Sequence, residues 1–168
     1  MNGGGERKFD EDSLLLSIAP YGYIGGELAL EEDSVLENDA ESPCEVTGTL
    51  TGTGTLKGKF RLSGATWKIP MRSRSREAQC VRFETPDGNC LANVGKLSFS
   101  FDGKPLLLRY VVGPAFGLPA DDPEKLAGLV EVSVPGKPFP YDGMEPAVEN
   151  GVLILKNLRP GGTTLILN

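Results

Sequence analysis

Apolar and polar residues alternate without a break from position 46 to position 62. The even positions hold apolar residues or glycine, and the odd positions hold threonine, lysine or arginine. Because successive side chains of a β-strand point to opposite faces, this period of two predicts β-structure with one apolar face and one wet, cationic face. A single strand of this length is unusual, so the pattern predicts a hairpin that turns at residues 52–54 and sets Leu50 opposite Leu56.

Turn signals divide the rest of the chain into short apolar segments. The pair Asp-Gly at 102–103 predicts a second hairpin, because this dipeptide is typical of two-residue turns. The pair Asn-Gly at 150–151 begins a last hairpin, whose strands are expected at 152–158 and 163–167. A terminal strand of this kind can pair with the sheet edge of a neighbouring chain.

A short helix is predicted near 123–128, where Asp122 can cap the first turn and Pro123 takes the first helical position. The other segments amount to about ten short strands separated by turn signals, a pattern typical of all-β folds. The predicted fold class is therefore all-β, an antiparallel β-sandwich of the jelly-roll or immunoglobulin-like type. A closed, calycin-like barrel is the alternative.

The chain of 168 residues is long enough for one domain with a proper core. We expect a flexible tail at 1–12, which is glycine-rich and then charged, followed by a single β domain at 13–168. The first residues lack the apolar region of a signal peptide, and the three cysteines are an odd number. These features favour a reducing, intracellular compartment, with an extracytoplasmic location as the alternative if a precursor is trimmed.

Histidine is absent from the chain, and this absence restricts the available chemistry. It excludes Ser-His-Asp and Cys-His nucleophile systems and the common histidine-based zinc and iron sites. No phosphate-binding glycine loop precedes a helix, so no nucleotide motif is present. We therefore expect no catalytic residue, no metal site and no cofactor; a carboxylate-dependent enzyme of glycosidase type is the third functional alternative.

Charge is segregated along the chain, which has a net charge of −6. Residues 1–45 contain twelve acids and two bases, whereas residues 57–82 contain eight bases and one acid. Such asymmetry points to an anion-binding or partner-binding patch, or to internal pairing between the two segments. The candidates for an anion or partner site are Lys57, Lys59, Arg61, Arg72, Arg74 and Arg76. Nucleic acid is a weaker candidate, because the wet face has threonine where base stacking requires aromatic residues.

Several aromatic residues alternate with polar ones and could line a cavity if the sheet closes. The candidates are Tyr21, Tyr23, Trp67, Phe99 and Tyr110. The leading functional prediction is a non-catalytic β-sandwich that acts through its surfaces, as a protein-binding or assembly subunit. A barrel that binds a small apolar molecule is the alternative, and no membrane span is expected.

Overall fold

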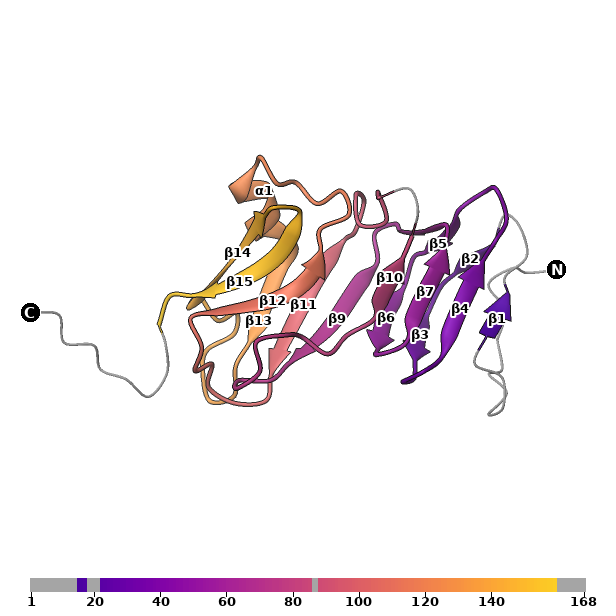
Figure 1. Cartoon of the computed structure of the whole chain (residues 1–168). Helices are drawn as coiled ribbons and strands as arrows, with labels where there is room; N and C mark the ends of the chain where they lie inside the picture. Colours follow the sequence, from indigo (N-terminus) through magenta and orange to yellow (C-terminus); the bar gives the residue numbers. More distant parts are fainter. Residues whose placement is uncertain (1–14, 18–21, 86–87, 160–168) are drawn as a thin grey trace, which may run out of the picture.

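The structure of the protein, a computed structural model, describes residues 15–17, 22–85 and 88–159 (Figure 1). The described residues contain fifteen strands and one helix. Their bounds are β1 (Leu15–Ser17), β2 (Tyr23–Ile24), β3 (Glu27–Leu30), β4 (Val35–Asn38), β5 (Cys44–Val46), β6 (Thr49–Gly52), β7 (Thr55–Gly58), β8 (Phe60–Leu62), β9 (Thr66–Met71), β10 (Arg82–Glu84), β11 (Lys96–Phe101), β12 (Arg109–Pro114), α1 (Pro123–Leu129), β13 (Val130–Ser133), β14 (Met144–Glu149) and β15 (Val152–Asn157).

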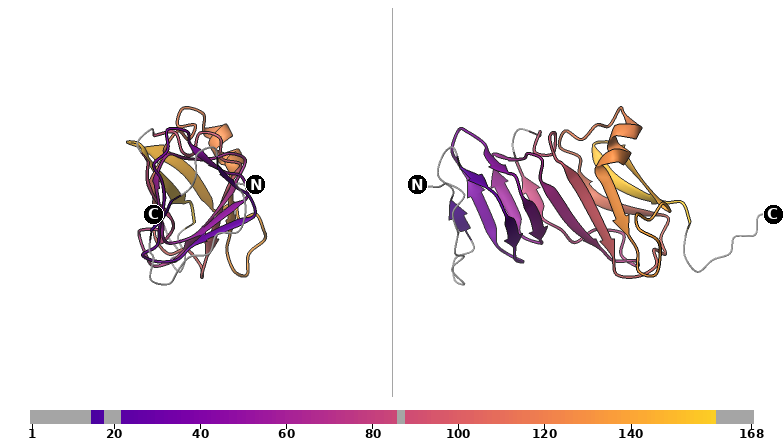
Figure 2. Two further views of the ribbon diagram at one scale, coloured as in Figure 1. Left: turned by 90° about the vertical axis from the view of Figure 1, so that its right-hand side faces the viewer. Right: turned by 180° about the vertical axis from the view of Figure 1, so that it is seen from behind.

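The first ten strands wind as the coils of a parallel β-helix with three faces (Figure 1). Sheet A has the order β1-β4-β7-β10, sheet B has β2-β5-β8, and sheet C has β13-β11-β9-β6-β3. Neighbouring strands in these three sheets are parallel, because each strand pairs with its counterpart one coil away. Viewed along the long axis, the strands surround a central core (Figure 2). This is the stacked architecture of a solenoid.

Apolar side chains from successive coils stack on one another inside the β-helix. In sheet C, Leu28, Leu50, Trp67 and Leu97 occupy one register position on four successive strands, and all four are buried. Burial of a side chain of this size contributes about 1.5–3 kcal/mol. The even positions of the run from 46 to 62 supply the inward-facing residues of β5 to β8, so the predicted apolar face is the core of the coils.

The coils turn at tight corners where backbone lies directly on backbone. Gly58 pairs with Asn38 of the preceding coil and has a φ of 97°. A Cβ atom at Gly58 would overlap the carbonyl group of Asn38. Asn38 is itself fixed, because its buried Nδ2 donates to the carbonyl oxygens of Ser42 (2.9 Å) and Lys59 (2.8 Å). The corner therefore requires glycine at position 58.

Sheet D and α1 complete the C-terminal end of the molecule (Figure 1). Strands β12, β15 and β14 form this sheet in antiparallel order, with a bulge between Val111 and Gly113. Helix α1 begins after Asp122, whose carboxylate accepts a hydrogen bond from the backbone N–H of Lys125. The short helix expected near 123–128 is confirmed. It is not long and apolar enough to cross a membrane, and it is the one helix of the described chain.

The predicted fold class is wrong in its architecture. The structure is largely β, but three of its four sheets are parallel, so it is neither an antiparallel sandwich nor a closed barrel. The hairpin at 52–54 is absent: Leu50 pairs with Leu28 and Trp67 rather than with Leu56. Glycines that could close a hairpin instead turn the chain from one face of the β-helix to the next.

The two other predicted hairpins also need correction. At 102–103 the chain leaves sheet C, and β12 joins sheet D instead of pairing with β11. The Asn-Gly turn at 150–151 is present, but it joins β15 to β14, a strand that the sequence pattern did not predict. The expected partner strand at 163–167 and the expected tail at 1–12 lie outside the described residues.

Candidate functional site

The basic residues of β7 and β8 lie on acidic residues of the preceding coil. Lys57 is 3.9 Å from Glu37 between Nζ and Oε2, and Arg61 is in register with Glu45. The Nζ atom of Lys59 donates to the carbonyl oxygen of Glu41 at 2.9 Å. Lys57 belongs to sheet A and Arg61 to sheet B. The sequence pattern places Lys57 and Arg61 on one solvent-exposed side of a hairpin. In the structure they lie on different faces of the β-helix, each near an acidic segment.

The remaining anion-site candidates lie in the connection between β9 and β10. Arg72, Arg74 and Arg76 are exposed there, in a loop with no strand. Arg76 lines a groove of about 580 Å³ together with Arg109, Val111 and residues 106–108. The arginines at 72 and 74 do not line this groove. Binding of an anion or a partner by these residues stays a prediction.

Three of the five predicted cavity-lining aromatic residues, Trp67, Phe99 and Tyr110, are components of the core. Phe99 and Tyr110 are fully buried, Tyr23 is half exposed on β2, and Tyr21 lies outside the described residues. The hydroxyl of Tyr110 donates to the carbonyl oxygen of Ser73 (2.5 Å) and accepts from the backbone N–H groups of Leu106 and Leu107 (3.0 Å each). Tyr110 thus joins two loops to the core.

Trp67 is buried as well, and its ring also forms part of the wall of an open cleft of about 430 Å³ beside β10. Its ring meets the ring of Phe83 edge to face, with centroids 5.0 Å apart. Cys80, Val81 and Val112 add further apolar surface, and Glu77, Arg82 and Glu84 stand among the lining residues. The indole N–H of Trp67 has no hydrogen-bond partner among the described residues. The cleft is therefore apolar with charged residues around it.

The cleft lies where sheet A ends. Strand β10 is the last strand of this sheet, and among the described residues no strand pairs with its other edge. The N–H of Arg82 donates to the carbonyl oxygen of Gly54 at 2.9 Å. Because successive peptide groups of a strand point to opposite sides, the N–H and C=O of Phe83 face away from β7, toward the cleft. Phe83 is half-buried, although Leu56, its counterpart on β7, is fully buried.

The next coil does not extend sheet A past β10. A single parallel bridge joins Val111 to Glu77, in the middle of the connection between β9 and β10, and β12 then pairs with β15 in sheet D. The bulge between Val111 and Gly113 leaves Val112 outside the ladder with β15. Figure 1 shows β12 turned away from the direction of β10. The cleft therefore opens between two strands that belong to different sheets.

The thiol of Cys80 in this cleft is held in its neutral form. Burial raises the pKa of Cys80 from 9.0 to about 12, and this lowers the thiolate fraction near pH 8 about a thousandfold. Because the thiolate is the nucleophile, Cys80 contributes apolar surface to the cleft and no reactive group.

We expect Cys80 to resist alkylation by iodoacetamide in the native protein at pH 8 and to react fully in urea. The measurement is mass-spectrometric mapping of the modified peptides against time. A Leu108→Cys variant supplies a control thiol, because the side chain at 108 is 69% exposed. Modification of Cys80 as fast as the thiol at 108 would show that burial does not protect it.

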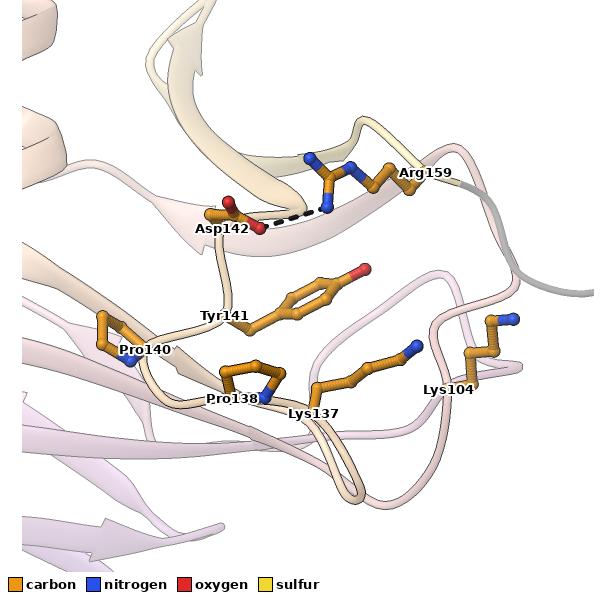
Figure 3. Close-up of a pocket in the computed structure, with 7 residues that line it drawn as sticks. All are labelled: Lys104, Lys137, Pro138, Pro140, Tyr141, Asp142 and Arg159. Atoms are coloured by element: carbon orange, nitrogen blue, oxygen red, sulfur yellow. Dashed lines mark hydrogen bonds and ion pairs between the residues drawn. The ribbon is translucent and has the colours of Figure 1, made fainter.

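A second pocket, of about 500 Å³, lies at the C-terminal end of the molecule (Figure 3). Its polar groups come from Lys104, Lys137, Tyr141, Asp142 and Arg159. Asp142 and Arg159 form an ion pair of 3.3 Å between Oδ1 and Nη1. Figure 3 shows the hydroxyl of Tyr141 and the Nζ atoms of both lysines directed to the same side of the pocket. No carboxylate of the described residues lies within ion-pair distance of either lysine.

The sequence patterns did not single out the residues of this pocket. They come from three connections that are far apart along the chain, and none of them belongs to a charge run. The cleft beside β10 was missed for a related reason, since it exists because β12 leaves the β-helix. Of the residues that the sequence indicates as cavity-lining, Trp67 lines the cleft.

Comparison with known proteins gives no relative for this fold: the chain matches no protein-family model, no curated protein and no solved structure. Within the described part of the chain, no group of three or more cysteine, aspartate or glutamate side chains is arranged to hold a metal ion.

Proposed function

We propose that the protein is a non-catalytic binding module that takes up an extended segment of a partner protein along the edge of β10. One observation carries the proposal: an unpaired strand edge and an apolar cleft occur at the same place. Peptide recognition by strand addition uses both features, because main-chain hydrogen bonds give affinity and side-chain pockets give specificity.

The expected geometry follows from sheet A. An added strand takes the position of a fifth strand in this sheet, beside β10, and exchanges hydrogen bonds with the peptide groups of Phe83. An inward-pointing side chain of that strand then enters the cleft and contacts Trp67 and Phe83. Because these walls are apolar and aromatic, we expect an apolar or aromatic residue at this position of the partner. The neutral thiol of Cys80 fits a binding role for the cleft.

The test is selection of peptides from a displayed random library against the full chain, followed by N-methylation of each selected peptide residue by residue. Strand addition predicts that methylation at the residues paired with Phe83 weakens binding at least tenfold. Methylation at the intervening residues leaves it unchanged, because their N–H groups point away from β10. Amide shifts in NMR spectra at 81–84 and 112–113 locate the bound peptide.

Two substitutions of Phe83 separate the contribution of its backbone N–H to peptide binding from the contribution of its side chain. Phe83→Ala and Phe83→Pro both remove the ring, but only proline removes the N–H that faces the cleft. We expect the proline variant to lose peptide binding and the alanine variant to keep part of it. Equal binding by the two variants, or selected peptides that shift amides elsewhere, would contradict strand addition. Sedimentation of each variant shows whether the added strand can come from a second copy of this chain.

A further inference from the structure

We infer that the C-terminal pocket binds a small organic molecule through a phosphate group, at a site separate from the cleft beside β10. The two share no lining residue. The pocket is lined by the cations of Lys104, Lys137 and Arg159 and by the single carboxylate of Asp142, to which the guanidinium of Arg159 points (Figure 3). Because like charges repel, three cations around one pocket favour an anion that neutralises them.

The charge of the pocket indicates a doubly charged anion. Three cations and one carboxylate give the pocket a net charge of +2. A phosphate monoester carries about −1.5 to −2 at neutral pH and so neutralises it. A phosphate also has three oxygens that accept charge-assisted hydrogen bonds from ammonium and guanidinium groups. A carboxylate would leave part of this positive charge uncompensated. The donors available are the two lysines, Arg159 and the hydroxyl of Tyr141.

The size and walls of the pocket indicate the rest of the ligand. A volume of about 500 Å³ is more than inorganic phosphate requires, and it falls in the range of small-molecule sites. Pro138, Pro140 and the ring of Tyr141 supply apolar surface beside the cations. An organic body attached to the phosphate can pack on these walls, so we expect an aromatic phosphate ester to bind more tightly than phosphate alone.

The ion pair between Asp142 and Arg159 provides a sharp test of this site. Asp142 competes with an incoming anion for the guanidinium of Arg159, and both side chains are largely exposed. Asp142→Asn removes the competing charge with little change in shape. We expect this variant to bind phenyl phosphate several-fold more tightly than the original protein. A misfolded variant cannot produce such a gain, and the amide spectrum of the variant shows whether it is folded, so that a loss of binding can also be interpreted.

The measurement is an NMR titration of the full chain with phenyl phosphate, inorganic phosphate and benzoate. Phenyl phosphate should bind most tightly and shift the amides of Lys137, Tyr141 and Asp142. Lys104→Gln combined with Lys137→Gln should weaken its binding at least tenfold. The matched control is Lys68→Gln combined with Lys125→Gln, which removes the same charge from exposed lysines outside the pocket and should leave affinity within twofold.

Four results would overturn the proposal. These are no saturable shift with phenyl phosphate at millimolar concentration, equal losses in the two double variants, weaker binding by Asp142→Asn, and benzoate binding as tight as that of phenyl phosphate. Equal losses would mean that the anion responds to net charge alone. None of these results depends on strand addition at β10, so the two sites are tested independently.

Discussion

Replacing Gly58 with alanine is expected to lower the free energy of unfolding by more than about 3 kcal/mol. Two costs add at this position. The φ of 97° lies in a region that residues with a Cβ atom adopt only with strain. The new Cβ atom would also overlap the carbonyl group of Asn38 on the preceding coil. Asn38 cannot move away without breaking its bonds to Ser42 and Lys59.

Gly64→Ala is the matched control for this substitution. Gly64 also has a positive φ, of 67°, but no atom outside its immediate chain neighbours lies within 4 Å of the position of its Cβ. Gly64→Ala should therefore lower the free energy of unfolding only by the cost of placing alanine at a positive φ, which is about 1–2 kcal/mol. Urea denaturation of both variants gives the difference. Equal losses would show that coil-to-coil contact at the corner contributes nothing beyond backbone conformation.

The run from 46 to 62 shows how far a sequence pattern determines this fold. Its period of two correctly predicts the large core residues, because Leu50, Leu56 and Phe60 are all fully buried, whereas Thr55, which the pattern assigns to the polar face, is buried too. The pattern does not determine which strand pairs with which. A chain that folds back at 52–54 and a chain that turns onward at each glycine give the same alternation. Pairing is decided by contacts one coil away, such as that between Leu50 and Leu28, and those contacts leave no local signal.

The repeat of the β-helix is hidden in the sequence because its coils differ in length. Along the central stack of sheet C, 22 residues separate Leu28 from Leu50, and 17 separate Leu50 from Trp67. The next steps, to Leu97 and then to Val130, take 30 and 33 residues. A solenoid is recognised from sequence by a fixed period, which these spacings do not have. The insertions that destroy the period also form the loops around the pockets.

Tyr110→Phe is expected to lower the free energy of unfolding by about 2 kcal/mol. The substitution removes one hydroxyl and keeps the buried ring, which packs edge to face on Phe101 with centroids 5.1 Å apart. The carbonyl of Ser73 loses a donor, and the N–H groups of Leu106 and Leu107 lose an acceptor. Leu106 and Ser73 keep a longer hydrogen bond to each other, of 3.3 Å, so the N–H of Leu107 is the group that loses its partner. A backbone group that is shielded from water and loses its partner costs about 1–3 kcal/mol, which exceeds the loss of an ordinary single hydrogen bond.

The same substitution should loosen two loops selectively. Because the hydroxyl joins the connection at 72–76 to the segment at 104–108, we expect faster amide hydrogen exchange in both, with little change in β3, β6 and β9 of sheet C. Tyr23→Phe is the control, since Tyr23 is 50% exposed and should change stability by less than about 0.5 kcal/mol. A loss of stability spread evenly over all protected amides would mean that Tyr110 supports the whole core. Exchange that accelerates at 72–76 and 104–108 first would show that its hydroxyl holds the arginine-bearing loop onto the end of the β-helix.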